Sequence, residues 1–585
     1  MDSSQALRND HCSRTNLVIV LLVLSAHVAL LIWGSRVHSP GYDEVGHIAA
    51  GITHWRTGDF TLYRVNPPLI RMIATLPLVI QGASVDGPRY WDNPLMRAEF
   101  SLGDAYIESR GPDAIRDFTI ARSMCIPFSL LGGWICYLWA GELFGVRAGL
   151  AALALWCGSP NIIAHAQMIT PDIGATSLGL LASYVFWNWL KAPSLARALW
   201  VGLCLGLALL AKFTWVVLPF VWIGLWLFAR IRSTPGTSRP LRWDVLEIAI
   251  LLFVATEVIS IGYGFDGIGT PIGRIRFHSR ALAPTETHLE NRFSGTWIGR
   301  LPTPVPVSML EGIDMQKQEF DKGYWSYLRG EWRYGGWWYY YLYAWMIKEP
   351  LGFWGLVGLA GLVSWRTDRL RPTFADVVVL APAFTVLVLV SAQTGFNHHL
   401  RYILPAFPFV FIAVSRVFRD DSDDRRSRIV PGLGAVSLAS FLVASVVHSP
   451  HHLSYFNEVA GGAANGPEHL LNSNLDWGQD LLFLKEWADH HPEARPLQIV
   501  FRGGFRSESL KVWDARTEHR YWADIGARSG SAEAPKWLAI SVSELFERPL
   551  GEDIYAKLRR RTPNDRAGET IYIYKIDKND IIGDQ

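Results

Sequence analysis

Charged residues and cysteines are both scarce in this sequence. Only 18% of its 585 residues are charged, whereas 50% are hydrophobic. This balance lies outside the range of ordinary soluble domains and indicates a membrane protein. The five cysteines all occur at or before Cys204, in the N-terminal tail or in hydrophobic runs. Their placement excludes a disulfide framework in exported parts of the chain.

An excess of charge of one sign is also missing. The chain has 55 basic and 53 acidic residues, so its formal net charge is +2. Nothing in this total points to nucleic acid as a partner. The distribution of the charges along the chain is more informative than their sum.

Long uncharged stretches predict a bundle of membrane-spanning helices. The first, residues 16–34, is long enough to cross a bilayer, and no small-residue cleavage site follows it, so we interpret it as a retained helix. Similar stretches predict about eleven transmembrane helices in all. They lie near residues 16–34, 117–141, 147–164, 172–190, 197–212, 213–230, 243–264, 351–365, 375–392, 402–417 and 430–448.

Basic residues concentrate in alternate connections between these helices, as in Arg230 to Arg242 and Arg416 to Arg428. Such connections face the cytoplasm, which predicts an integral plasma-membrane protein, in the bacterial inner membrane, with its N-terminus inside. Residues 35–116 and 265–350 then form outer loops. The predicted fold is mainly α, a polytopic helix bundle over residues 1–449.

Residues 450–585 are the part of the chain predicted to form a separate domain. They contain a helix-like stretch, DLLFLKEWADHH, and three strand-like runs, PLQIVF, KWLAISV and TIYIYKI. We therefore expect a small α/β domain on the extracytoplasmic side.

The first outer loop opens with two acids, Asp43 and Glu44, close to the lipid boundary. A carboxylate there is costly unless it is paired, hydrated or functional. Apolar residues then recur at helical spacing, which predicts an amphipathic helix at the membrane surface, with His47 and His54 on the stripe of Asp43. The histidines are either hydrated surface residues or substrate contacts. One acid with two histidines is no compelling ligand set, so we assign no metal ligands; dependence on a divalent metal stays open, and no other cofactor is predicted.

Further motifs follow in a fixed order. Asn66-Pro67-Pro68-Leu69 opens a second interfacial helix, and Arg122, Pro171-Asp172, the GLCLGLALLAK run ending at Lys212, and Arg401-Tyr402-Ile403-Leu404-Pro405 lie at helix ends. This ordered set resembles the C-type, or GT-C, membrane glycosyltransferases. These enzymes use polyprenyl-phosphate sugars and include protein O-mannosyltransferases and the bacterial aminoarabinose transferase.

One position departs from the aminoarabinose branch of that family. Its members carry a Glu-Lys pair just before the two prolines, where this chain has Val65 and Asn66. Arg64 either supplies the missing positive charge to the donor phosphate or extends to the membrane surface.

The resemblance implies transfer of a sugar from a polyprenyl-phosphate donor to a lipid or protein acceptor, with inversion, on the outer face of the membrane. Asp43 is the predicted general base. Glu44 orients the acceptor, holds Asp43 in place, or simply stabilises a helix N-terminus. Asp172 is a second catalytic acid, the partner of a buried cation, or a helix N-cap.

The leaving phosphate requires cations rather than a proton donor. Arg122, Lys212 and Arg401 are the predicted phosphate ligands, since all three fall at outer helix ends. Lys212 interrupts an apolar run, so we expect it to have a buried partner.

Other outer residues carry weaker predictions of substrate binding. These are His47, Asn66, Tyr402, Lys348, Asp476 and Trp477. Two of them have a structural alternative: Lys348 as an interfacial lysine, and Asp476 with Gln479 as a capping box. The Trp- and Tyr-rich residues 324–345 fit either sugar stacking or an aromatic belt.

Two other classes of function remain open from the sequence. A transporter or flippase of lipid-linked sugars also has many helices, but its polar residues are expected at the midplane and in repeated broken helices. An inactive glycan-binding membrane protein is the other alternative.

Overall fold

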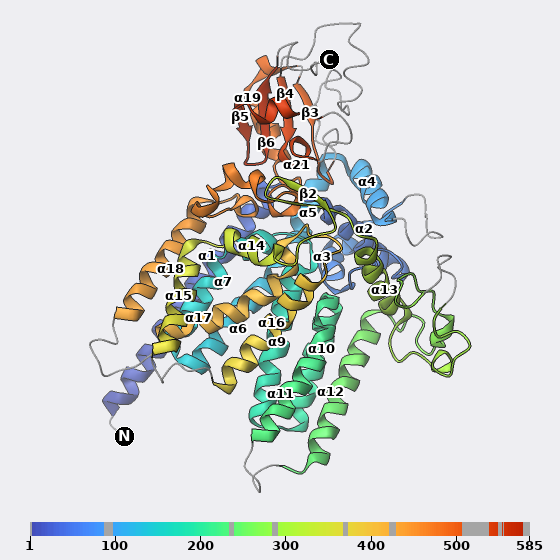
Figure 1. Ribbon diagram of the computed structural model, residues 1–585, viewed down its shortest axis with the longest axis vertical. Coiled ribbons are helices and arrows are strands. Elements are labelled where there is room, and N and C mark those ends of the chain that lie inside the picture. The colour runs from blue at the N-terminus through green and yellow to red at the C-terminus, as the bar shows by residue number, and fades with distance from the viewer. Residues whose placement is uncertain are drawn as a thin grey trace.

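A computed structural model describes residues 3–86, 97–232, 239–283, 291–366, 373–419, 429–495, 497–505, 537–547, 553 and 555–576. The chain is mainly helical, as predicted, and a small sheet stands at one end of a long helix bundle (Figure 1). The N-terminal helix α1, Ser3–Val37, begins at the opposite end of that bundle.

All eleven predicted stretches fall on helical segments. The stretch 16–34 lies in α1. The helices on the other ten stretches are Ile126–Phe144 (α6), Val146–Gly158 (α7), Pro160–Ala166 (α8), Pro171–Lys191 (α9), Leu195–Ala211 (α10), Leu218–Arg232 (α11), Leu241–Gly262 (α12), Leu351–Arg366 (α15), Phe374–Ala392 (α16), Phe407–Val414 (α17) and Ile429–Val447 (α18). The stretch 147–164 covers two of these helices, α7 and α8. Six helices in the described ranges are long and apolar enough to span a membrane by themselves, or seven if the bent α7–α8 pair is one span. The number eleven therefore stays a prediction.

Small residues allow the central helices to approach closely. A Cβ added to Gly202 or Gly206 of α10 would lie 2.5 Å or 2.6 Å from atoms of α12. Close backbone approach at small residues is a common mode of helix association in membranes. Large apolar side chains such as Phe220 point outwards, where Phe220 is 73% exposed.

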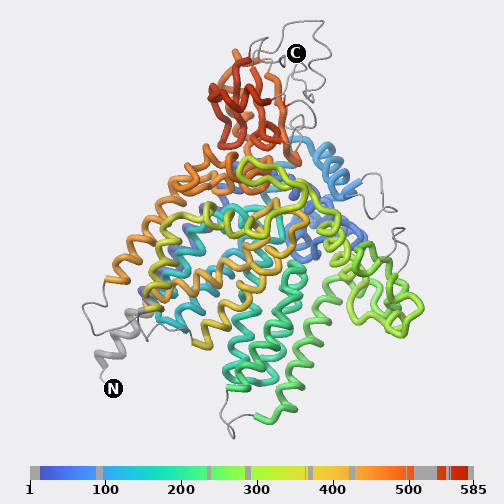
Figure 2. Tube along the Cα trace, viewed as in Figure 1, coloured from blue at the N-terminus to red at the C-terminus, as the bar shows by residue number. Residues whose placement is uncertain are grey.

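The first outer segment forms four helices, with bounds Tyr42–Thr57 (α2), Leu69–Ile80 (α3), Ala98–Arg110 (α4) and Ala114–Ser123 (α5). The predicted helix after Asp43 is therefore present, but its polar face is not exposed, and its position at the membrane surface stays a prediction. Every residue of α2 from Glu44 to His54 is buried, because α3 and α4 pack against it. Figure 2 shows this segment in blue beside the green outer segment that contains α13, Val307–Lys322.

The aromatic segment before α15 is partly extended. It forms a hairpin of β1, Trp325–Leu328, and β2, Glu331–Tyr334, and then α14, Tyr340–Lys348. This segment lies across the sheet-facing end of the bundle (Figure 1).

The C-terminal residues have the predicted α/β character. Helix α19, Leu481–His490, is followed by β3 (Leu497–Val500), β4 (Trp537–Ser541), β5 (Asp565–Ala567) and β6 (Ile571–Lys575). The strand order is β3-β4-β6-β5, with β3 and β4 parallel and the other pairs antiparallel. The domain boundary at residue 450 stays a prediction.

Candidate functional site

A cavity of about 560 Å³ opens where the first outer segment meets the bundle. Its walls come from the N-terminal ends of α2 and α9, the end of α10, α13, and the segment before α17. The lining residues are Tyr42, Asp43, His47, Tyr63, Val65, Asn66, Arg97, Phe100, Pro171, Asp172, Lys212, Gln316, Glu319, Tyr324, Phe396, His398, His399, Arg401 and Tyr402.

Four charged side chains alternate in sign along one wall. An Asp43 carboxylate oxygen lies 2.7 Å from Nη2 of Arg401, and Nη1 of Arg401 lies 3.8 Å from Asp172. Lys212 Nζ donates to the other oxygen of Asp172 at 2.6 Å. The predicted partner of Lys212 is therefore Asp172. Asp43 is the most accessible of the four, with 21% of its side chain exposed.

Helix ends place these groups at the cavity. Asp43 and Asp172 each stand second in their helix, where the positive end of the helix dipole stabilises a carboxylate. Thr170, not Asp172, occupies the N-cap position of α9. Lys212 follows the last turn of α10 in extended conformation, which turns its side chain towards Asp172.

Arg401 is fixed by contacts on several sides. Its guanidinium carbon lies 4.1 Å from the ring centroid of Trp477, and Lys212 Nζ lies 5.3 Å from the ring of Tyr402. The Nε of Arg401 and the second oxygen of Asp172 are buried and have no hydrogen-bond partner. The arginine is therefore a rigidly held cation in the cavity wall.

A second ionic group at the cavity was missed by the sequence analysis. Arg97, at the start of α4, pairs with Glu319 of α13 at 3.0 Å and also with Glu99. No local motif marks these residues. The histidines His398 and His399 were also missed, although their position just before Arg401 was a usable signal. Burial and nearby Arg401 hold the pKa of His399 well below its usual value, so its ring is neutral.

The two histidines of α2 have different surroundings. His47 lines the cavity and stacks on Tyr63 with ring centroids 4.3 Å apart, whereas His54 lies outside the cavity against Phe60. Both are buried, so their interpretation as hydrated surface residues is wrong. Burial, and then Arg71 and Arg401, hold the pKa of His47 well below its usual value.

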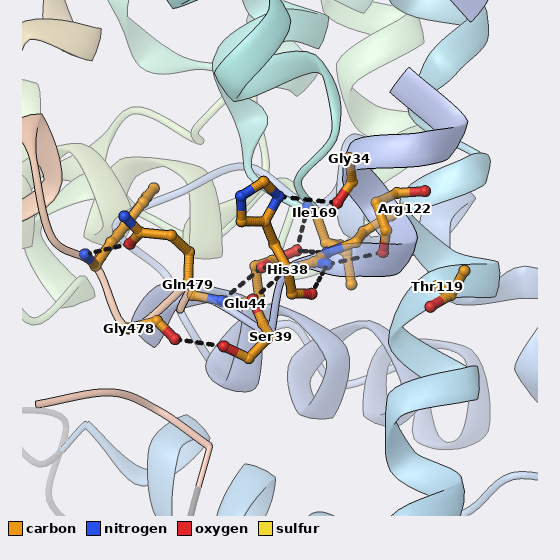
Figure 3. A network of polar contacts seen from close by, with 12 residues as sticks. Gly34, His38, Ser39, Glu44, Thr119, Arg122, Ile169, Gly478 and Gln479 are labelled. Carbon is orange, nitrogen blue, oxygen red and sulfur yellow. Dashed lines mark hydrogen bonds and ion pairs between the residues drawn. The ribbon is translucent and has the colours of Figure 1, made fainter. Parts of the chain in front are cut away.

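Arg122 and Glu44 do not line the cavity. They form a network of polar contacts with the segment around His38 and Ser39 (Figure 3). Arg122 makes five hydrogen bonds, two to Glu44 and three to the carbonyls of Ser35, His38 and Ser39. A guanidinium has five N–H donors, so none is left for a donor phosphate. The predicted phosphate-binding role of Arg122 is corrected accordingly.

Both carboxylate oxygens of Glu44 are also hydrogen-bonded within the protein. Besides Arg122, its two oxygens accept hydrogen bonds from the backbone N–H groups of Gly41 and Ile169. It is completely buried, so it does not reach an acceptor in the cavity. Of the alternatives open from the sequence, its contacts favour holding Asp43, its neighbour, in place.

Two further predicted ligands are engaged elsewhere. Arg64 pairs with Glu311 at 3.0 Å and does not line the cavity. Lys348 is 1% exposed, and its Nζ donates to the carbonyls of Leu453 and Asn474. Neither the substrate-binding nor the interfacial assignment of Lys348 agrees with this burial.

Asp476 and Trp477 lie behind Arg401 rather than on the cavity surface. Asp476 accepts hydrogen bonds from the N–H groups of Gly478 and Ser543, so the predicted capping box with Gln479 is wrong. Asn66 and Tyr402 do line the cavity. The carbonyl of Asn66 accepts a hydrogen bond from Arg71.

Comparisons with known proteins bear on this site. Residues 116–259, which run from α5 to α12 and include Asp172 and Lys212, match the family model of the dolichyl-phosphate-mannose-protein mannosyltransferases. No curated protein sequence gives a significant match.

Two solved structures are similar in overall arrangement. The crystal structure of ArnT from Cupriavidus metallidurans bound to undecaprenyl phosphate has a TM-score of 0.46 and 12% identity, over 97% of this chain and 99% of that chain. The oligosaccharyltransferase AglB from Archaeoglobus fulgidus, in complex with an inhibitory peptide and a dolichol-phosphate, has a TM-score of 0.40 and 14% identity, over 74% and 56%.

The family match lies on the helices that carry two of the four alternating charges. It agrees with the resemblance found in the sequence, over the stretch of chain that contains Asp172 and Lys212.

Proposed function

We propose that the cavity transfers a sugar from a polyprenyl-phosphate donor to an acceptor hydroxyl on the extracytoplasmic face, with Asp43 as general base. The observation that carries this proposal is the contact between Asp43 and Arg401, in a cavity that also holds the Asp172–Lys212 pair. A proton acceptor and cations for a phosphate thus line one cavity.

A residue of the cavity acts on each bond that forms or breaks in this reaction. Asp43 takes the proton of the acceptor hydroxyl as its oxygen attacks the anomeric carbon. The bond from that carbon to the phosphate oxygen breaks, and its electron pair leaves with the phosphate. Arg401 and Lys212 stabilise the charge on that phosphate, which is an adequate leaving group without protonation.

Arg401 has a second role in this proposal. Its ion pair holds the carboxylate of Asp43 in place beside the cations that meet the phosphate. Asp172 then anchors Lys212 rather than acting as a second base.

The orientation of the chain belongs to the same proposal. The N-terminus faces the cytoplasm, and the cavity and sheet face outwards, in the inner membrane of a bacterium. The basic residues of the connections support this, as Arg197, Arg230 and Arg416 all lie near helix ends away from the cavity.

Replacement of Asp43 by Asn tests the proposal. In proteoliposomes that contain lipid-linked sugar, we expect Asp43→Asn to lower the transfer rate by about 10²–10⁴-fold, the range for loss of a general base. The matched control is Asp113→Asn, an exposed acid in the turn before α5, which is expected to leave the rate unchanged.

Retained turnover in Asp43→Asn would refute the catalytic assignment. The flippase alternative is tested in the same vesicles by the transbilayer movement of a labelled lipid-linked sugar. Movement that depends on the protein and is unaffected by Asp43→Asn would favour the transporter.

A further inference from the structure

A second cluster of chemically active side chains lies outside the cavity, between the bundle and the C-terminal sheet. His38 follows α1, His451 follows α18, and Asp480 directly precedes α19. Each offers one possible ligand atom, and these three atoms lie within 4.8 Å of one another. In the described residues no other group of three histidine, cysteine or acidic side chains meets that condition.

The hydrogen bonds of this cluster leave its potential metal-ligand atoms unoccupied. Nδ1 of His38 lies 3.0 Å from the carbonyl of Gly34, and since a carbonyl only accepts, that nitrogen carries the proton. Nε2 of His38 therefore keeps its lone pair. Metal-bound histidines usually have such a carbonyl partner, which fixes the ring and its tautomer.

The two carboxylate oxygens of Asp480 have different surroundings. One of its oxygens accepts hydrogen bonds from the backbone of Glu569 and Thr570 and from the Thr570 hydroxyl. The other oxygen is fully buried and has no hydrogen-bond partner, although it lies 3.7 Å from Nδ1 of His451, which also has none. Tetrahedral zinc places its ligand atoms roughly 3.4 Å apart.

We propose that His38, His451 and Asp480 form a structural zinc site that joins the C-terminal sheet to the membrane bundle. Two imidazoles and one carboxylate suit zinc, with water as the fourth ligand on the side where His451 is 20% exposed. Phe483 covers another side of the cluster, with ring centroids 5.5 Å from His38 and 4.7 Å from His451.

The position of this site connects it with the cavity without making it part of the chemistry. The carbonyls of His38 and Ser39 accept hydrogen bonds from Arg122, which holds Glu44 beside Asp43 (Figure 3). The Ser39 hydroxyl donates to the carbonyl of Gly478 and accepts from the N–H of Leu481. A metal at His38 would stiffen the segment on which Asp43 is mounted.

Metal content tests this inference independently of any transferase activity. The full-length chain, purified in detergent with a tag free of histidine, is equilibrated with buffered zinc and analysed by mass spectrometry for bound metal. We expect about one zinc per chain. Asp480→Asn and His451→Asn should lose zinc by more than the roughly 10–100-fold weakening that follows loss of an outer-shell partner.

Three controls make the result specific. His490→Asn removes an exposed histidine from the helix that Asp480 precedes and should retain zinc. Asp43→Asn should also retain it, which separates this site from the cavity. Zinc should raise the Tm of the unaltered chain but not that of Asp480→Asn. The Tm measurement also shows directly whether the variant is folded.

Absence of bound zinc from the unaltered chain would overturn the proposal. Equal zinc binding by Asp480→Asn and the unaltered chain would also overturn it. If the unaltered chain binds no zinc, the cluster is an ordinary imidazolium–carboxylate pair.

Discussion

Asp172 is a buried carboxylate shared between two cations. Lys212 lies 2.6 Å from one oxygen, and Arg401 lies 3.8 Å from the other. Removing one partner of a buried ion pair typically costs about 3–5 kcal/mol, because the remaining charge stays buried without compensation. Arg401 offsets part of that cost here, since its charge also faces Asp172.

Replacement of Lys212 by Met is therefore expected to lower both the Tm and the transfer rate. The double variant Lys212→Met/Asp172→Asn removes both charges, so it should recover most of the Tm while its transfer rate stays low. Differential scanning fluorimetry and the proteoliposome assay measure the two quantities. Recovery of the rate in the double variant would show that Lys212 serves stability alone.

The sequence was informative about single residues where a motif carried them. Asp43, Asp172, Lys212 and Arg401 were singled out, and all four line the cavity. Arg97 and Glu319 were not, since their ion pair joins positions 222 residues apart and neither position has a local pattern. Arg122 was misjudged because a helix-end arginine has the same local signal whether it binds a ligand or the backbone.

At the scale of elements, Arg122 connects three of them: the end of α1, the start of α2, and α5, on which it stands. We expect Arg122→Gln to lower the Tm, because it leaves Glu44 buried without a counter-charge. The Kd for polyprenyl phosphate in the folded fraction should stay close to that of the unaltered chain. A large rise in this Kd, with an unchanged Tm, would restore the phosphate-binding role.

Helix α2 is held against α4 by a glycine contact. A Cβ on Gly103 would lie 2.4 Å from the carbonyl oxygen of Val45, so α2 and α4 would have to separate. We expect Gly103→Ala to destabilise the protein by about 1–3 kcal/mol, the usual cost of overpacking, and to lower the transfer rate by displacing Asp43.

The control is Gly361→Ala in α15, where nothing lies within 4 Å of an added Cβ. Alanine is the better helix former, so its Tm should be unchanged or slightly higher. Equal Tm values for the two variants would contradict the tight α2–α4 contact.

The sequence of α2 did not predict which elements pack around it. Its pattern of apolar residues was correctly interpreted as a helix, but one apolar stripe fits a membrane surface and a protein groove equally well. Burial of its polar face depends on α4, whose contacts are set by Gly103 and by Arg97, far along the chain. Local periodicity contains no information about such partners.

At the scale of the whole molecule, Asp476 links the bundle to the sheet through Ser543. Burial raises the pKa of Asp476 to about 6, against an ordinary value of 3.8. Because the folded protein binds this proton more tightly than the unfolded chain, the contribution of Asp476 to stability is complete below pH 4. It is lost as the pH rises through 6.

Asp476→Asn should remove that dependence. Between pH 4 and pH 7, the difference in Tm between the unaltered chain and Asp476→Asn is expected to shift steadily in favour of the variant. Scanning fluorimetry across that range measures the difference, and Asp489→Asn, an exposed acid of α19, is the control. A constant difference would mean that Asp476 is ionised throughout.

The stacking of Trp477 on Arg401 has a consequence for how the donor arrives. One flat face of the guanidinium is covered by the indole, and two of its nitrogens are directed at Asp43 and Asp172. A phosphate in the cavity therefore does not approach the arginine through the face that the indole covers. Trp477 belongs to the C-terminal region and packs behind Arg401, so this region limits the directions from which a phosphate reaches the arginine.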